Sequence, residues 1–153
     1  MTDLSKKNEH QCCNIMLAED DEDDILLFKE ACDNGRKAIQ IRIVNNGLEA
    51  IISLGKLAML DMLFLDINMP LMNGIECLLE VRKSYITLPV IMLTTSADRD
   101  LIKQVKALGA SGFITKPRTI GKFQATMKEV FSIDWTKHQD SFYLNINQGT
   151  ILS

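Results

Sequence analysis

Five polar side chains follow apolar segments of the chain, at positions where their chemistry can be combined. They are Glu19, Asp20, Asp66, Thr94 and Lys116. Three carboxylates held close together repel one another unless they are protonated or bind a cation. Oxygen ligands at a partly open site suit Mg²⁺, which keeps several waters and takes one or two carboxylates plus a phosphate oxygen. The residue types therefore indicate a magnesium site.

The ammonium of Lys116 and the hydroxyl of Thr94 indicate that the site also binds phosphate. Lys116 can balance phosphate charge, and the hydroxyl of Thr94 can donate a hydrogen bond to a phosphoryl oxygen. Together with the carboxylates they predict phosphoryl transfer onto Asp66, which would form an aspartyl phosphate. Each residue taken alone also fits an ordinary role in a loop, a helix cap or the surface. The prediction rests on their joint placement.

Five strands alternating with five helices must position these residues. The strands are predicted at 14–18, 39–44, 62–65, 89–93 and 112–115. The helices are predicted at 22–33, 48–57, 74–84, 97–108 and 119–131. Such alternation implies right-handed crossovers and an α/β doubly wound parallel sheet with helices on both faces. All parallel strands end at the same rim, so the polar residues that follow them converge there.

Two features refine this arrangement. Segment 39–44 is the one predicted strand that alternates apolar with polar residues, which places it at an edge of the sheet. Segment 62–65 is apolar throughout and stops at Asp66, as a buried central strand would. The turn-forming residues Pro70 and Gly74 follow it, so a loop must form at the end of this strand.

Composition limits the function further. A chain of 153 residues with 46% hydrophobic content is long enough for one domain with a full core. The net charge of −3 disfavours direct DNA binding, which needs clustered basic residues. Neither a signal peptide nor an apolar run of membrane-spanning length is present in the sequence. The four cysteines form no zinc or disulfide pattern, so a cytoplasmic protein with reduced thiols is expected.

Four short segments resemble the receiver domain of two-component response regulators, and the resemblance covers residues 14–131. They are LAEDD at 17–21, LDINMPLMNG at 65–74, LTTSA at 93–97 and FITKP at 113–117. The chain resembles, in particular, stand-alone receivers of the chemotaxis-regulator type. The resemblance implies a flavodoxin-like five-stranded parallel sheet with strand order 2-1-3-4-5.

The resemblance also implies a role for each matching residue. Asp66 would accept a phosphoryl group from a histidine kinase or a phosphotransfer protein, and Lys116 would contact that group. Thr94 and Phe113 would form the switch that responds to phosphorylation. The implied Mg²⁺ ligands are Glu19, Asp20, Asp66 and the backbone carbonyl of Asn68. The peptide bond before Pro117 is expected to be cis.

The expected organisation is a flexible arm at 1–13, the receiver domain at 14–131 and a C-terminal extension at 132–153. The extension is too short for a separate output domain. Its aromatic residues allow it to pack on the domain, to dock on a partner or to form a homodimer, and a disordered end is the remaining alternative. The expected function is a single-domain response regulator that switches contacts with a downstream protein or relays its phosphate, and is not an enzyme.

Two other functions compete with this interpretation. One is a receiver-like interaction module that is not phosphorylated, although such modules usually lack the acceptor or the acidic pair. The other is a Mg²⁺-dependent phosphohydrolase of the haloacid dehalogenase type. That class uses a second Asp two residues after the nucleophile, where this chain has Asn68.

Overall fold

The computed structural model describes residues 14–33, 39–146 and 150–152 of the chain, so the predicted arm at 1–13 lies outside the described residues. The strands that correspond to the prediction are β1 (Asn14–Ala18), β2 (Gln40–Val44), β3 (Met62–Asp66), β4 (Val90–Thr94) and β5 (Gly112–Thr115). The helices are α1 (Glu22–Cys32), α2 (Gly47–Leu54), α3 (Gly74–Ser84), α4 (Arg99–Ala107) and α5 (Ile120–Ser132). Every predicted element is present, with ends that shift by up to three residues.

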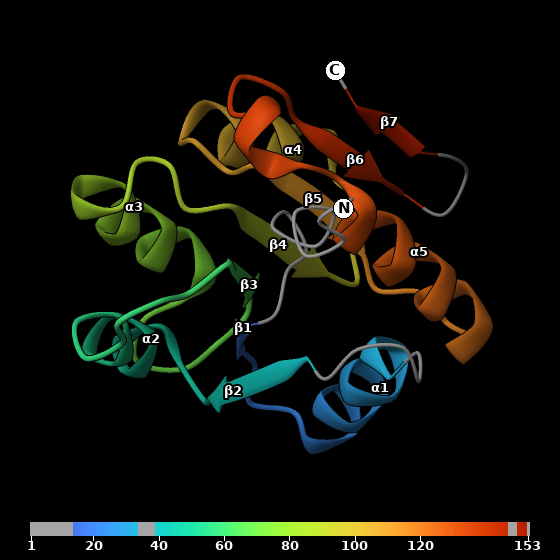
Figure 1. Cartoon of the computed structure of the whole chain (residues 1–153), viewed down its shortest axis with the longest axis horizontal. Helices are drawn as coiled ribbons and strands as arrows, with labels where there is room; N and C mark the ends of the chain where they lie inside the picture. Colours follow the sequence, from blue (N-terminus) through green and yellow to red (C-terminus); the bar gives the residue numbers. More distant parts are fainter. Residues whose placement is uncertain (1–13, 34–38, 147–149, 153) are drawn as a thin grey trace, which may run out of the picture.

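The sheet confirms the predicted topology and extends it (Figure 1). Strands β1 to β5 are parallel and lie in the order 2-1-3-4-5, with β2 at the edge as expected. Beyond β5 the chain adds β6 (Tyr143–Asn145), parallel to β5, and β7 (Thr150–Leu152), antiparallel to β6. The predicted five-stranded sheet is therefore seven-stranded.

Side-chain caps determine where the helices begin. The residue before each of the five α-helices accepts a hydrogen bond from a backbone N–H of the first turn. Before α3 the cap is reciprocal, because Asn73 accepts from the Glu76 N–H while the Glu76 carboxylate accepts from the Asn73 N–H. A cap of this kind contributes about 1 kcal/mol to helix stability. The cap of α3 thus fixes the helix that starts directly after the loop carrying Asn68.

Two apolar layers cover the sheet. One face packs against α2, α3 and α4, with Leu54, Leu78 and Val105 among the buried side chains. The other face packs against α1 and α5, which lie side by side, with Phe28 and Phe123 in its core. Among the described residues, every helix is too short or too polar to cross a membrane.

The C-terminal extension packs on the domain instead of extending away from it. The chain from β5 through α5 to β6 repeats the strand–helix–strand unit of the rest of the fold. Phe142 and Tyr143 point to opposite faces of the sheet and are buried in its two apolar layers. The indole N–H of Trp135 donates to the carbonyl of Val130, and its ring lies 6.3 Å from that of Tyr143. Residues 135–146 therefore belong to the folded domain.

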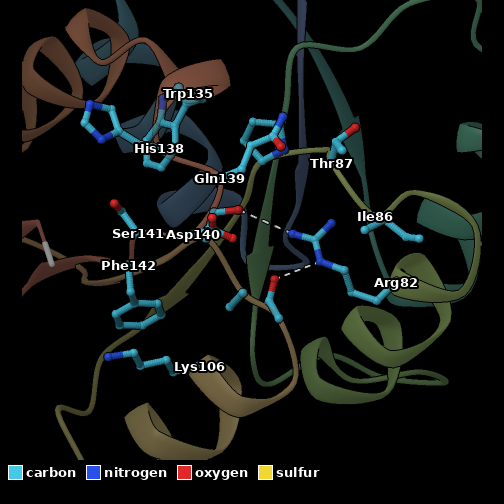
Figure 2. Close-up of a pocket in the computed structure, with 14 residues that line it drawn as sticks. Arg82, Ile86, Thr87, Lys106, Trp135, His138, Gln139, Asp140, Ser141 and Phe142 are labelled. Atoms are coloured by element: carbon cyan, nitrogen blue, oxygen red, sulfur yellow. Dashed lines mark hydrogen bonds between the residues drawn. The ribbon is translucent and has the colours of Figure 1, made fainter.

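A cavity of about 190 Å³ lies between this extension and the strand ends opposite Asp66 (Figure 2). Arg82 at the end of α3 points into it. Its guanidinium donates to the carbonyls of Gly109 and Leu88, both at 2.7 Å, and to the hydroxyl of Ser111 at 3.3 Å. Burial lowers the pKa of Arg82. Arg82 thus ties α3 to the segments that precede β4 and β5.

Candidate functional site

The carboxyl-end rim of the sheet brings the predicted site residues together. Asp66 is the last residue of β3 and Thr94 the last of β4, and the register pairs Asp66 with Leu93 and Thr94 with Thr115. Glu19 follows β1 and its N–H donates to the carbonyl of Val44 at 2.9 Å. Lys116 follows β5, where its N–H donates to the Thr94 carbonyl at 2.7 Å.

Three carboxylates form an acidic cluster on this rim. Oxygen atoms of Glu19, Asp20 and Asp66 all lie within 4.8 Å of one another. Glu19 and Asp66 are only 2% and 5% exposed, whereas Asp20 is exposed to solvent. Burial raises the pKa of both Glu19 and Asp66, against the opposing effect of Lys116. A divalent cation with oxygen ligands and an open side toward solvent fits this donor set.

Lys116 joins the cluster from the other side. Its ammonium lies 2.8 Å from the Glu19 carboxylate, 2.8 Å from that of Asp24 and 3.4 Å from that of Asp66. Burial of Lys116 acts to lower its pKa, but hydrogen bonds to Asp24 and Glu19 and the charges of Asp66 and Glu19 outweigh it and raise the pKa. The ammonium is therefore held protonated among three carboxylates.

Thr94, Phe113 and Asn68 occupy different surroundings. The buried hydroxyl of Thr94 accepts a hydrogen bond from the Ser96 N–H at 3.3 Å, so it faces the start of the next loop. Phe113 is fully buried in β5 and packs in the same apolar layer as Phe142. Asn68 is exposed in the loop after Asp66, and its backbone N–H bonds to the Asp66 carboxylate. Asn68 thus lies at the acidic cluster.

One expectation about this rim is wrong. The resemblance implies a cis peptide bond before Pro117, but the described residues contain no cis peptide bond, so this bond is trans. The trans form is favoured for most bonds before proline.

Sequence reasoning also missed Asp24 as a site residue, because it assigned Glu19 and Asp20 to the strand end but Asp24 only to the predicted helix at 22–33. No local pattern signals this contact, because Asp20 precedes the cap of α1 and Asp24 lies in its first turn, so helical spacing does not relate the two.

Gly74 holds the loop after Asp66 close to the strand. Its N–H donates to the carbonyl of Ile67 at 3.0 Å, which closes the loop. A Cβ atom at position 74 would clash with the backbone carbonyl of Asp66 and would lie 2.9 Å from the Cα of Ile67. Both obstacles are backbone atoms, so no side-chain movement relieves them. The first residue of α3 is therefore restricted to glycine by the position of Asp66 itself.

We expect Gly74→Ala to destabilise the fold by about 1–3 kcal/mol, the range for added volume in a packed region. Gly121→Ala is the matched control, because a Cβ there meets nothing within 4 Å. That control should leave stability unchanged or raise it by about 0.5–1 kcal/mol, since alanine favours the helix. Urea unfolding followed by circular dichroism measures both. Equal stability of the two variants would contradict this account of the loop.

A doubly wound sheet of order 2-1-3-4-5, with an acidic cluster and a lysine on its carboxyl-end rim, defines the class of receiver-type signalling modules. The family model of the response regulator receiver domain matches residues 15–128. The chain belongs to this family.

Relatives of known function include a protein-glutamate methylesterase/protein-glutamine glutaminase of a Nocardioides species. It is 30% identical over 113 residues, which cover 71% of this chain and 31% of the relative. A glycerol metabolism activator of Pseudomonas putida is 35% identical over 101 residues, or 61% of this chain and 44% of the relative. The chain thus spans less than half the length of these relatives.

Solved structures match over nearly their full length. The phosphorylated cyanobacterial phytochrome response regulator RcpA superposes with a TM-score of 0.73 at 27% identity, covering 84% of this chain and 96% of that one. The chemotaxis response regulator CheY4 of Vibrio cholerae gives 0.68 at 26% identity, covering 78% and 98%. Both are similar in fold and in sequence to this chain.

Proposed function

We propose that this protein is a single-domain response regulator that accepts a phosphoryl group on Asp66 in a Mg²⁺-dependent reaction. The observation that carries the proposal is the acidic cluster, with carboxylate oxygens within 4.8 Å of one another and the Lys116 ammonium 3.4 Å from Asp66. Glu19, Asp20, Asp66 and the backbone carbonyl of Asn68 would hold the ion. Mg²⁺, when bound, neutralises charge that develops on the transferred group.

The remaining chemistry belongs to side chains of the chain itself. A carboxylate oxygen of Asp66 attacks the phosphorus of the donor. Lys116 supplies positive charge next to the transferred group. Thr94 would exchange its contact with the Ser96 N–H for a hydrogen bond to a phosphoryl oxygen. The proposed donor is the phosphohistidine of a histidine kinase or of a phosphotransfer protein in the cytoplasm.

Phosphorylation would then act on a pre-existing equilibrium between two packings around Thr94 and Phe113. Phe113 pairs in register with Leu144 of β6, so a change at β5 would reach the C-terminal extension directly. We propose that the output is a protein contact, with a downstream target or a second copy of the chain, or relay of the phosphate. The near-complete overlap with single-domain regulators supports this role over that of an enzyme.

Intact-mass spectrometry after incubation with acetyl phosphate tests the proposal. We expect one phosphoryl adduct when Mg²⁺ is present and none when the ion is removed with a chelator. Addition of Mg²⁺ after chelation should restore the adduct, which controls for damage to the protein. Failure to form an adduct with either acetyl phosphate or a phosphorylated histidine kinase would favour a constitutive interaction module.

A further inference from the structure

The pairing of Lys116 points to a role for Asp24. The ammonium lies as close to Asp24 as to Glu19, at 2.8 Å, and farther from Asp66, at 3.4 Å. Asp24 does not belong to the acidic cluster. We propose that Asp24 is a positioning residue that holds Lys116 back from the phosphoryl group on Asp66 and thereby slows phosphorylation. The inference rests on the proposed function.

The backbone of Asp24 is fixed where the contact requires it. Asp24 lies in the first turn of α1, where its N–H donates to the side chain of the cap residue Asp21 at 3.0 Å. Helix α1 packs along α5, which begins four residues after Lys116. The Lys116 side chain is 11% exposed and that of Asp24 is 37% exposed, so the pair is partly shielded from water. The contact therefore links two elements that the fold already holds together.

Metal binding would make Asp24 the main carboxylate that competes with the phosphoryl group for Lys116. In the proposed function Glu19 is a cation ligand, so its carboxylate would be shared between the ion and Lys116. Asp24 is not a ligand of the ion in this proposal. Its carboxylate therefore stays free to pair with the Lys116 ammonium, in competition with the phosphoryl group. Opposite charges at this distance attract more strongly when they are partly buried. Lys116 must loosen its contact with Asp24 to approach the phosphoryl oxygens fully.

The structure leaves room for that movement. Lys116, Asp24 and Glu19 line a cavity of about 290 Å³ between α1 and the segment after β5. The apolar side chains of Phe28 and Phe123 also line this cavity, and the aliphatic part of a lysine packs favourably against such surface. The ammonium already lies 3.4 Å from the Asp66 carboxylate, so the movement toward a phosphoryl group on Asp66 is short.

The affected step is transfer from the phosphodonor. With acetyl phosphate, an oxygen of the Asp66 carboxylate forms a bond to phosphorus while the bond from phosphorus to the acetyl oxygen breaks. The bonding electron pair leaves with acetate, and no proton needs to move. Lys116 stabilises the transferred group in proportion to its closeness, so releasing it from Asp24 should accelerate this step.

The first test compares Asp24→Asn with Asp23→Asn. Both remove one negative charge from the same turn of α1, but Asp23 is exposed and makes no ion pair among those of the described residues. We expect Asp24→Asn to raise the rate constant for adduct formation about two- to fivefold, the scale of a partly exposed ion pair. Asp23→Asn should match the wild type. Asp24→Glu should show a rate constant for adduct formation near that of the wild type, because glutamate retains the negative charge that pairs with Lys116.

A double-mutant cycle tests whether Asp24 acts through Lys116. In a Lys116→Gln background, Asp24→Asn should give no further acceleration. An acceleration that persists there would overturn the inference in favour of simple charge repulsion between Asp24 and the donor. An unchanged or slower Asp24→Asn variant would also overturn it. If the wild type itself forms no adduct, the proposed function fails. If the wild type forms an adduct at a rate that does not depend on Asp24, only the inference about Asp24 fails.

Discussion

Asp66→Asn should abolish the phosphoryl adduct while leaving the protein folded. The amide that replaces the carboxylate is not a nucleophile, and the acidic cluster loses one of its three charges. The same substitution relieves the burial of an ionised group, because Asp66 is 5% exposed and burial raises its pKa. We therefore expect a melting temperature at least as high as that of the wild type.

Intact-mass spectrometry with acetyl phosphate and Mg²⁺ measures the adduct, and calorimetry measures the melting temperature. Asp23→Asn serves as the control for a lost acidic charge near the site and should keep the adduct. An adduct of wild-type extent on the Asp66→Asn variant would place the phosphoryl group on another residue. A large fall in its melting temperature would instead mean that Asp66 stabilises the fold.

Tyr143→Ala should have the largest effect on stability, a loss of about 3–5 kcal/mol. The ring is fully buried in β6, packs edge-on against Trp135 and contributes to the apolar layer under α5. Its hydroxyl also accepts a hydrogen bond from the Asn145 amide at 3.4 Å. Removal of the ring leaves a cavity between the extension and the sheet.

Urea unfolding monitored by circular dichroism gives the change in free energy, and Gln139→Ala is the matched control. Gln139 lies in the same extension but is exposed, so its loss should cost less than about 0.5 kcal/mol. If Tyr143→Ala also cost less than about 1 kcal/mol, residues 135–146 would not be part of the cooperative core.

The order of strands, the edge position of β2 and the convergence of Asp66, Thr94 and Lys116 follow from the sequence. These features depend on long apolar segments and on the rule that parallel strands end at one rim. Asp66 was recognisable because an apolar strand stops there and turn formers follow. The same logic placed Glu19 and Asp20 beside it.

The remaining features depend on contacts that a local pattern does not encode. Strand β6 has only three residues, too few for a clear alternation, and it pairs with β5 some thirty positions earlier. The contact between Asp24 and Lys116 joins residues 92 positions apart. Helical phase shows on which side of α1 Asp24 lies, but not which cation it meets.

The place of Trp135 has a consequence for optical measurements. It is the one tryptophan of the chain, and the structure sets its indole against Tyr143 and the end of α5, away from the acidic cluster. Its fluorescence therefore reports on how the extension docks on β5 and α5, with no contribution from a second indole. Emission that changes on phosphorylation would show, without any label, that the signal from Asp66 has reached β6, on the far side of β5.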